Sequence, residues 1–250
     1  MSENEFTLYD RLEKDYWWFK ARRNILSVFL SHIEKIEEKT ILEIGCGAGG
    51  NLKYLFPDFL KRIGLEINET AIKYARGKIT DNTKIIRGDA NDLGTVQERV
   101  NCVALLDVLN HKNIKSVNSV LVQVNKLLKK DGYLLISDGA FNFLEGSHSE
   151  NVDSARRFTI KELTSKLIKS NFRIIKASYW GFSLFFILFL KRAIFERLFR
   201  KRISNKSNDL VSIPIIDSIF YFLVNSETIV LKKGDLPLGA SLAILAQKTD

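Results

Sequence analysis

The sequence has few of the residues that mark secreted or disulfide-bonded proteins. It contains only two cysteines, Cys46 and Cys102, and both lie in apolar surroundings. A disulfide scaffold shows more cysteines at regular spacing, so both are expected to be reduced core residues of a cytoplasmic protein. The first residues lack a basic segment followed by an apolar run, so no signal peptide is expected.

Histidines and long apolar runs are also scarce. The three histidines, His32, His111 and His148, belong to no cluster with metal-ligand spacing, so no metal site is predicted. The apolar run from Tyr179 to Leu190 has 12 residues, whereas a membrane-spanning helix needs about 20. What is present is ordinary for a globular chain of 250 residues, with 46% hydrophobic and 27% charged residues. One large domain with an insertion is therefore expected.

The formal net charge of +9 is unevenly distributed. Residues 191–206 read KRAIFERLFRKRISNK, with seven basic residues and one acid, directly after an apolar run. The basic residues alternate with Ile, Phe and Leu, which makes nucleic acid an unlikely partner. Residues 181–206 instead resemble an interfacial segment that binds an anionic membrane surface. The alternative is a helical lid whose apolar face covers an acceptor pocket.

Short apolar runs alternate with amphipathic runs from residue 40 to about 180. This alternation predicts an α/β fold with a doubly wound, mostly parallel sheet and right-handed crossovers. Positions 117–128 follow the helical period, and Thr159 with Glu162 forms a capping box. The expected strands are 40–44, 62–67, 83–87, 101–107, 132–138, 172–180 and 241–248.

Three parts follow from this pattern. Residues 1–39 are expected to form an N-terminal helical lid. Residues 40–180 and 236–250 form the core, and the last strand is SLAILAQK. Residues 181–235 interrupt the alternation and are expected to be a helical insertion before that strand.

The stretch ILEIGCGAGGN, residues 41–51, satisfies two glycine patterns. Gly45, Gly47 and Gly50 fit the dinucleotide pattern G-x-G-x-x-G, and Glu43 opens the pattern E-x-G-x-G-x-G that surrounds S-adenosylmethionine. Both cofactors need a close backbone approach and an acid that holds ribose hydroxyls, and Glu66 fits that role. The glycines and Glu66 therefore leave the cofactor open.

Glu43 favours S-adenosylmethionine. It lies at the end of the first predicted strand, where a dinucleotide would place its pyrophosphate, and repulsion there costs a few kcal/mol at an effective dielectric constant of about 20. A sulfonium and an ammonium group would instead be attracted. The alternative is that Glu43 caps a backbone amide. An NAD-dependent oxidoreductase and a non-catalytic nucleotide-binding regulator remain as alternative functions.

Two further acids end strands. Asp89, in RGDAN, is placed to accept from the adenine amine, and Asp107, in LLDVLNH, lies beside the expected methyl group. Together with Glu43 and Glu66, these residues place acids at four successive strand ends. Such a series is a stronger signal than any one of them, because single acids at strand ends often only solvate loops.

Residues 40–139 with these motifs resemble a class I S-adenosylmethionine-dependent methyltransferase. The resemblance implies a seven-stranded sheet whose last strand is antiparallel, and methyl transfer by in-line displacement to a small-molecule, sugar or lipid-linked acceptor. Glu66 departs from the family, which usually has aspartate there. The implied cofactor-binding residues are Glu43, Gly45, Cys46, Gly47, Asn51, Glu66, Ile67, Asp89, Ala90, Leu106, Asp107 and Arg22.

The segment YWWFKARR, residues 16–23, and the tail DLPLGASLAILAQK are similar to a bacterial and archaeal subgroup of surface-glycan or lipid-linked sugar pathways. Arg22 or Arg23 could pair with the methionine carboxylate, or the arginines could be solvated while the tryptophans pack. His111 and Asp107 are the catalytic candidates, with His111 as a general base or as a packing residue. The expected location is the cytoplasm, with the inner membrane surface as a further possibility.

Overall fold

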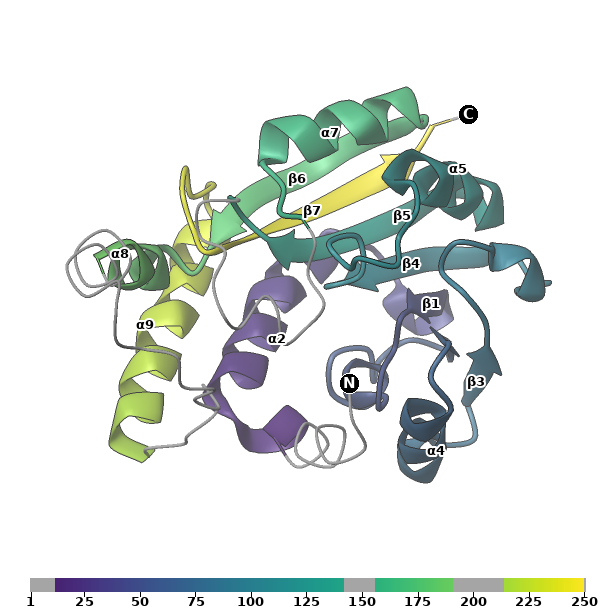
Figure 1. Ribbon diagram of the computed structural model, residues 1–250, viewed down its shortest axis with the longest axis horizontal. Helices are drawn as coiled ribbons and strands as arrows, with labels where there is room; N and C mark the ends of the chain where they lie inside the picture. The colour runs from purple at the N-terminus through teal and green to yellow at the C-terminus, as the bar shows by residue number, and fades with distance from the viewer. Residues whose placement is uncertain (1–11, 142–155, 191–213, 250) are drawn as a thin grey trace.

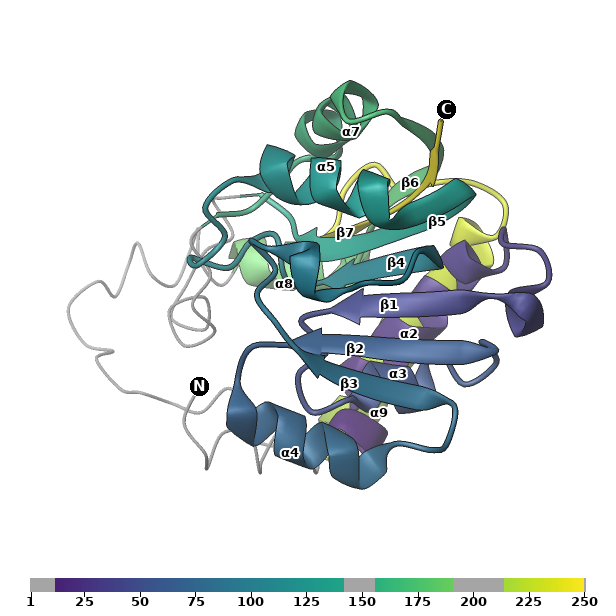
Figure 2. The same ribbon diagram turned by 90° about the vertical axis from the view of Figure 1, so that its right-hand side faces the viewer.

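In the computed structural model the chain forms one seven-stranded sheet with helices on both faces (Figures 1 and 2). The structure describes residues 12–141, 156–190 and 214–249. The strand order is β3-β2-β1-β4-β5-β7-β6. Strand β7 runs antiparallel to β5 and β6, and the pairs among β1 to β5 are parallel. The strands are β1 (Thr40–Ile44), β2 (Lys61–Glu66), β3 (Thr83–Arg87), β4 (Val100–Leu106), β5 (Leu128–Gly139), β6 (Phe172–Trp180) and β7 (Ser241–Lys248).

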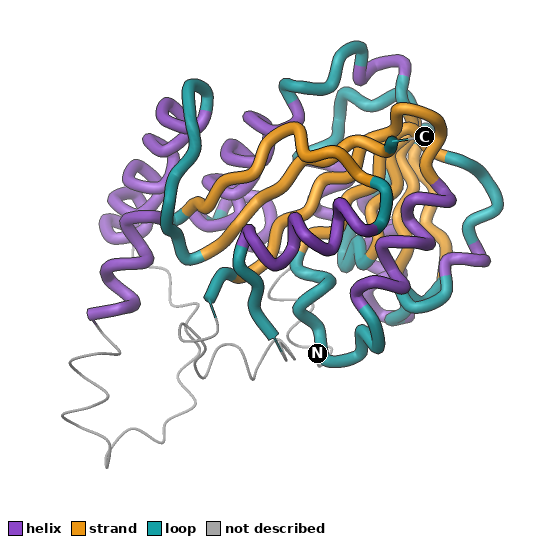
Figure 3. The backbone as a smooth tube through the Cα atoms, turned by 90° about the horizontal axis from the view of Figure 1, so that it is seen from above, coloured by secondary structure: helices purple, strands orange, loops and turns teal. Residues whose placement is uncertain are grey.

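The sheet is covered on each face by a separate group of helices (Figure 3). Helices α5 (Val117–Leu127) and α7 (Ile160–Lys169) pack on one face. The other face carries α2 (Trp17–Leu30), α3 (Gly50–Tyr54), α4 (Glu69–Lys78) and α9 (Pro214–Leu231). Strand side chains alternate between the two cores: Leu42 and Ile44 belong to the first and Ile41 to the second. A sheet covered on both faces explains the continuous apolar strands of the sequence.

Side-chain caps start three of the helices. The Asn68 side chain accepts from the Ala71 amide, the Ser116 side chain from Ser119, and the Thr159 hydroxyl from Glu162. The last is the Thr159 half of the predicted capping box, at the predicted start of that helix. Each cap provides an acceptor for an amide that has no partner inside its helix, so the helix starts are fixed by local sequence.

Several predicted strand boundaries were wrong. Strand β2 ends at Glu66, so Ile67 lies outside it, and β5 begins at Leu128 rather than at residue 132. Asp131 lies inside that strand with a φ of 57°. The β4–β5 register shifts between Val100 and Cys102, so the chain accommodates the Asp131–Gly132 pair as a strand irregularity.

The described part of residues 181–235 holds two helices between β6 and β7, α8 (Phe182–Leu190) and α9. Helix α9 lies along α2, as Figure 1 shows. The basic residues 191–206 lie outside the described residues. Among the residues that the structure describes, no helix is long and apolar enough to cross a membrane.

Candidate cofactor-binding site

The glycine turn follows β1 at the carboxyl end of the sheet. Gly45, Gly47 and Gly49 have φ values of 72°, 53° and 82°, which L residues with side chains rarely adopt. A Cβ on Gly45 would lie 2.8 Å from the Cγ2 atom of Val108, whereas a Cβ on Gly47 would meet nothing within 4 Å. Gly45 therefore allows close packing against the loop after β4, while Gly47 lines open space where a ligand can approach the backbone.

Glu66 holds the glycine turn and the start of α4. Its Oε2 accepts from the Gly47 amide at 3.0 Å, and its Oε1 accepts from the Ile67 and Asn68 amides at 2.9 Å. A carboxylate has about four acceptor positions, so these three bonds leave room for a ribose hydroxyl. Ile67 is exposed beside it. The ribose role of Glu66 stays a prediction, and its role in fixing the turn is an addition from the structure.

Glu43 is a buried carboxyl group with one oxygen that has a partner and one that has none. It is 1% exposed, and its Oε1 accepts from the Asn51 side-chain amide at 2.7 Å. Its Oε2 has no hydrogen-bond partner among the described residues. Burial raises the pKa of Glu43 to about 8. The Asn51 contact orients the carboxyl group, and the second oxygen is available to a cationic ligand.

Arg22, on α2, is the second buried charged group with unused hydrogen-bonding capacity. Its Nη1 lies 2.9 Å from Oδ2 of Asp107, and its guanidinium lies 5.1 Å from the centre of the Trp18 ring. It is 6% exposed, and its Nε and Nη2 have no partner among the described residues. A guanidinium with two free donors suits a carboxylate.

Arg23 points elsewhere. Its guanidinium donates to the carbonyls of Glu13 and Lys14 and lies over the Tyr54 ring. It therefore ties the helical residues 12–15 to α2 and α3. Of the two arginines that the sequence left as alternatives, only Arg22 lies beside a strand-end acid in the structure.

The end of β4 supplies Leu106, Asp107 and His111. Leu106 is buried, and Asp107 adopts a φ of 58° with its amide donating to the Ser137 carbonyl at 2.8 Å. The Nδ1 of half-buried His111 accepts from the Asn113 amide at 3.2 Å. A neutral imidazole that accepts at Nδ1 carries its proton on Nε2, so this tautomer offers a donor rather than a base at Nε2. The base role of His111 stays a prediction that this contact does not support.

The remaining predicted residues lie around the same edge. Asp89 accepts from the backbone and side-chain amides of Asn91 at 2.8 and 2.9 Å, and Ala90 is partly buried beside it. The thiol of Cys46 packs where a Cβ on Gly64 would be, so it points into the core. Burial raises the pKa of this thiol well above its usual value. Cys46 can therefore line the site only through its backbone.

Sequence reasoning missed two carboxyl groups. Asp138, at the end of β5, is fully buried and accepts from the Asn110 amide, and burial beside Asp107 raises its pKa. The pattern of strand-end acids, read one strand further, would have found it. Glu13 pairs with Lys78 on α4 at 2.6 Å, and a Cβ on Gly50 would collide with its carboxylate. No sequence signal joins Glu13 to these distant positions.

These residues can be tested for their fit to S-adenosylmethionine. The amino-acid end of that cofactor carries a carboxylate and an ammonium group, and its sulfur is positively charged. The two orphaned donors of Arg22 match the carboxylate, the orphaned oxygen of Glu43 matches the ammonium, and the open space at Gly47 matches the backbone approach. The residues fit. Among the described residues, no group of three His, Cys, Asp or Glu side chains could hold a metal ion.

Comparisons with known proteins agree with this geometry. A family model described as "Methyltransferase domain" matches residues 42–136. Phosphoethanolamine N-methyltransferase of Plasmodium falciparum is 27% identical over 165 residues, which cover 61% of this chain and 62% of that protein. Fatty-acid O-methyltransferase of Mycolicibacterium smegmatis is 31% identical over 106 residues, 41% of this chain and 38% of that protein. The chain thus matches less than two thirds of the length of either relative.

Solved structures share the fold. A SAM-dependent methyltransferase from Archaeoglobus fulgidus superposes with a TM-score of 0.60 at 19% identity, covering 98% of this chain and 99% of that one. An S-adenosylmethionine-dependent methyltransferase from Mesorhizobium loti gives 0.59 at 14% identity, with 90% and 98% covered. The predicted seven-stranded fold with an antiparallel last strand is confirmed. Residues 42–136 thus match a methyltransferase domain model, and the solved structures share the fold of the chain. S-adenosylmethionine is the methyl donor that such a domain implies.

Proposed function

We propose that this chain is an S-adenosylmethionine-dependent methyltransferase that acts on a small-molecule or lipid-linked acceptor. The observation that carries the proposal is a pair of buried ionisable groups with unused hydrogen-bonding atoms, Arg22 on α2 and Glu43 at the end of β1. Buried polar groups without partners are costly, so their presence favours a ligand that completes them. A zwitterionic amino-acid end completes both at once.

When bound, the cofactor supplies a methyl group on a positively charged sulfur. An acceptor atom would receive this methyl group by in-line displacement, and the electron pair of the broken bond would remain on the sulfur. Positioning supplies much of the catalysis of such a displacement, so the protein must mainly orient the two reactants. Asp107, held by Arg22, would face the positively charged sulfur, and the Nε2 of His111 would offer a hydrogen-bond donor to the acceptor molecule.

An amphiphilic acceptor is favoured by two observations. The curated relatives are named for a phosphate-bearing amine and for fatty acids, which are small acceptors that lipids contain or release. The apolar run 181–190 and the basic run 191–206 also suit a peripheral position on an anionic membrane surface. A lipid-linked sugar, which the N-terminal and C-terminal motifs suggest, is also an amphiphilic acceptor.

The alternative of an NAD-dependent oxidoreductase is disfavoured by Glu43. A carboxyl group buried beside the glycine turn would face the pyrophosphate, and ionised it would repel that group by a few kcal/mol at a dielectric constant of about 20. A non-catalytic binder of S-adenosylmethionine would keep Arg22 and Glu43 but would show no turnover.

An acceptor screen tests the proposal. The protein is incubated with S-adenosylmethionine labelled on its methyl group and with separate pools of phospho-amines, fatty acids, sugar nucleotides and polyprenyl-linked sugars. Label transfer to one pool, lost in an Asp107→Asn variant that still binds S-adenosylhomocysteine, is expected. Binding of S-adenosylhomocysteine with no transfer to any pool would favour the regulator.

A further inference from the structure

Helix α9 carries an apolar face that no described element covers. Six large apolar side chains on it are between 42% and 75% exposed. Successive residues of a helix are rotated by about 100°, which places 215, 219, 222, 229 and 230 within one face about 100° wide. The exposed residues are Ile215, Ile216, Ile219, Phe222, Ile229 and Val230.

The opposite side of α9 is bound to the protein. Val224 and Leu231 are buried in the core shared with α2, and the Glu227 carboxylate accepts from the Gly181 amide at 2.7 Å and also from Ser183 at the start of α8. Asp217 and Glu227 are the charged residues of α9, and both lie on this side by helical geometry. The outward stripe therefore has apolar side chains and Ser226 but no charge. Its orientation is fixed, because the inner face is anchored.

We propose that this outward face of α9 docks on an anionic phospholipid bilayer. Contiguous exposed apolar surface of this kind marks an interaction site in soluble proteins. Charge complementarity selects the occupant: the chain carries a net charge of +9, and seven basic residues lie between residues 191 and 206, in the sequence that joins α8 to α9. Phe186 on α8 adds another exposed aromatic ring.

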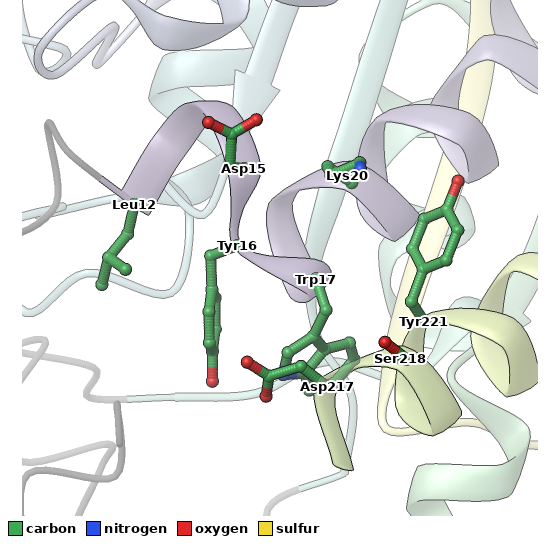
Figure 4. A pocket seen from close by; sticks show the side chains of 8 residues that line it. All are labelled: Leu12, Asp15, Tyr16, Trp17, Lys20, Asp217, Ser218 and Tyr221. Atoms are coloured by element: carbon green, nitrogen blue, oxygen red, sulfur yellow. The ribbon is translucent and has the colours of Figure 1, made fainter. Parts of the chain in front are cut away.

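A pocket of about 320 Å³ lies beside the first turns of α9, between that helix and the start of α2 (Figure 4). Figure 4 shows the rings of Tyr16, Trp17 and Tyr221 around it, with the Asp217 carboxylate close to Trp17. Tryptophan and tyrosine are enriched where a membrane meets water, because their rings are apolar and their edges are polar. The Lys20 ammonium lies 5.2 Å from the centre of the Tyr221 ring. Asp15 and Asp217 also line this pocket, so its aromatic rings suit headgroup depth while its charge does not attract an anionic headgroup.

The inference rests on the proposed function and names the surface that would hold the methyltransferase at a membrane. Its test needs no cofactor. The full-length protein is floated with vesicles of phosphatidylglycerol and phosphatidylethanolamine, and with phosphatidylcholine vesicles as the neutral comparison. Phe222→Asp places a charge in the stripe without touching the core, since Phe222 is 71% exposed. The matched control is Ile168→Asp, on α7, where Ile168 is 62% exposed. We expect Phe222→Asp to reduce the bound fraction roughly tenfold or more, the scale set by one large apolar side chain, and Ile168→Asp to leave it unchanged.

A fluorescent label reports which face enters the bilayer. Cys46 and Cys102 are buried, so an environment-sensitive thiol dye on an Ile219→Cys variant reports the stripe, and the same dye on Ile168→Cys is the control. Fluorescence should rise with anionic vesicles at position 219 only. Equal binding of Phe222→Asp and wild type would overturn the inference. So would wild-type protein that stays unbound to anionic vesicles at low salt. A wild type that sediments as a dimer, and a Phe222→Asp variant that sediments as a monomer, would show instead that the stripe binds a second copy of the chain. S-adenosylhomocysteine binding is measured in parallel, so that loss of the proposed function is distinguished from loss of docking.

Discussion

Arg22 gives the sharpest prediction about the cofactor. Its side chain is buried, its Nη1 is engaged by Asp107, and its Nε and Nη2 have no partner among the described residues. If these donors bind the carboxylate of the cofactor, Arg22→Met removes charge-assisted hydrogen bonds while keeping a side chain that packs on Trp18. Hydrogen bonds to charged groups contribute about 1.5–3 kcal/mol, so the dissociation constant of S-adenosylhomocysteine should rise roughly 10- to 100-fold.

The effect on stability should be smaller than the effect on binding. The Asp107 side chain that loses its partner is 42% exposed, so solvent screens it and the ion pair contributes little to folding. Thermal unfolding of Arg22→Met should therefore stay close to that of the wild type.

Calorimetry with two ligands isolates the carboxylate contact. S-adenosylhomocysteine has the amino-acid end, whereas 5′-methylthioadenosine has the nucleoside and thioether without it. Arg22→Met should weaken the first ligand and leave the second unchanged, and Arg23→Met serves as the neighbouring-arginine control. Equal weakening of both ligands, or an unchanged affinity for S-adenosylhomocysteine, would refute the assignment.

Three further predictions follow from the site. Gly45→Ala should lower the melting temperature and abolish S-adenosylhomocysteine binding, because its Cβ would collide with Val108. Gly47→Ala should lower the melting temperature less, because its Cβ meets open space and only its φ of 53° is unfavourable for alanine; thermal unfolding of both variants checks this. The pKa of Glu43 is raised from 4.5 to about 8, so the folded state binds more protons than the unfolded state in that window, and the free energy of unfolding should fall as pH rises from about 4.5 to about 8. Urea unfolding should show that slope in the wild type and a smaller one in Glu43→Gln; equal slopes would contradict the shift. Glu66→Ala should weaken S-adenosylhomocysteine by roughly 1.5–3 kcal/mol in calorimetry, and unchanged affinity in a folded variant would remove the ribose assignment.

The central part of the fold could be predicted because its signals are local. The apolar runs gave β1, β3, β6 and β7 at their observed boundaries, and the Thr159 capping box placed the start of α7. The start of β5 was missed because residues 128–131 are mostly polar and join the sheet through an irregular pairing with β4. Pairing with β4 decided where β5 begins, and the sequence of β5 alone carries no information about that pairing.

The site could be predicted as a set of strand ends but not as a set of contacts. The glycine turn, Glu43 and Glu66 were found because their spacing follows the chain. The pairing of Arg22 with Asp107 joins α2 to the end of β4, and only packing of α2 against the sheet brings them together. The choice between Arg22 and Arg23 likewise depended on the direction each side chain takes from the helix.

The measurement that tests the central claim most directly is calorimetry of the unmodified protein with S-adenosylhomocysteine and, separately, with NAD. The claim is that the glycine turn, with Glu43 and Arg22 beside it, holds an amino-acid-bearing nucleoside rather than a pyrophosphate. The expected result is one saturable site for S-adenosylhomocysteine and no detectable heat with NAD. Saturable binding of NAD without a response to S-adenosylhomocysteine would contradict the account.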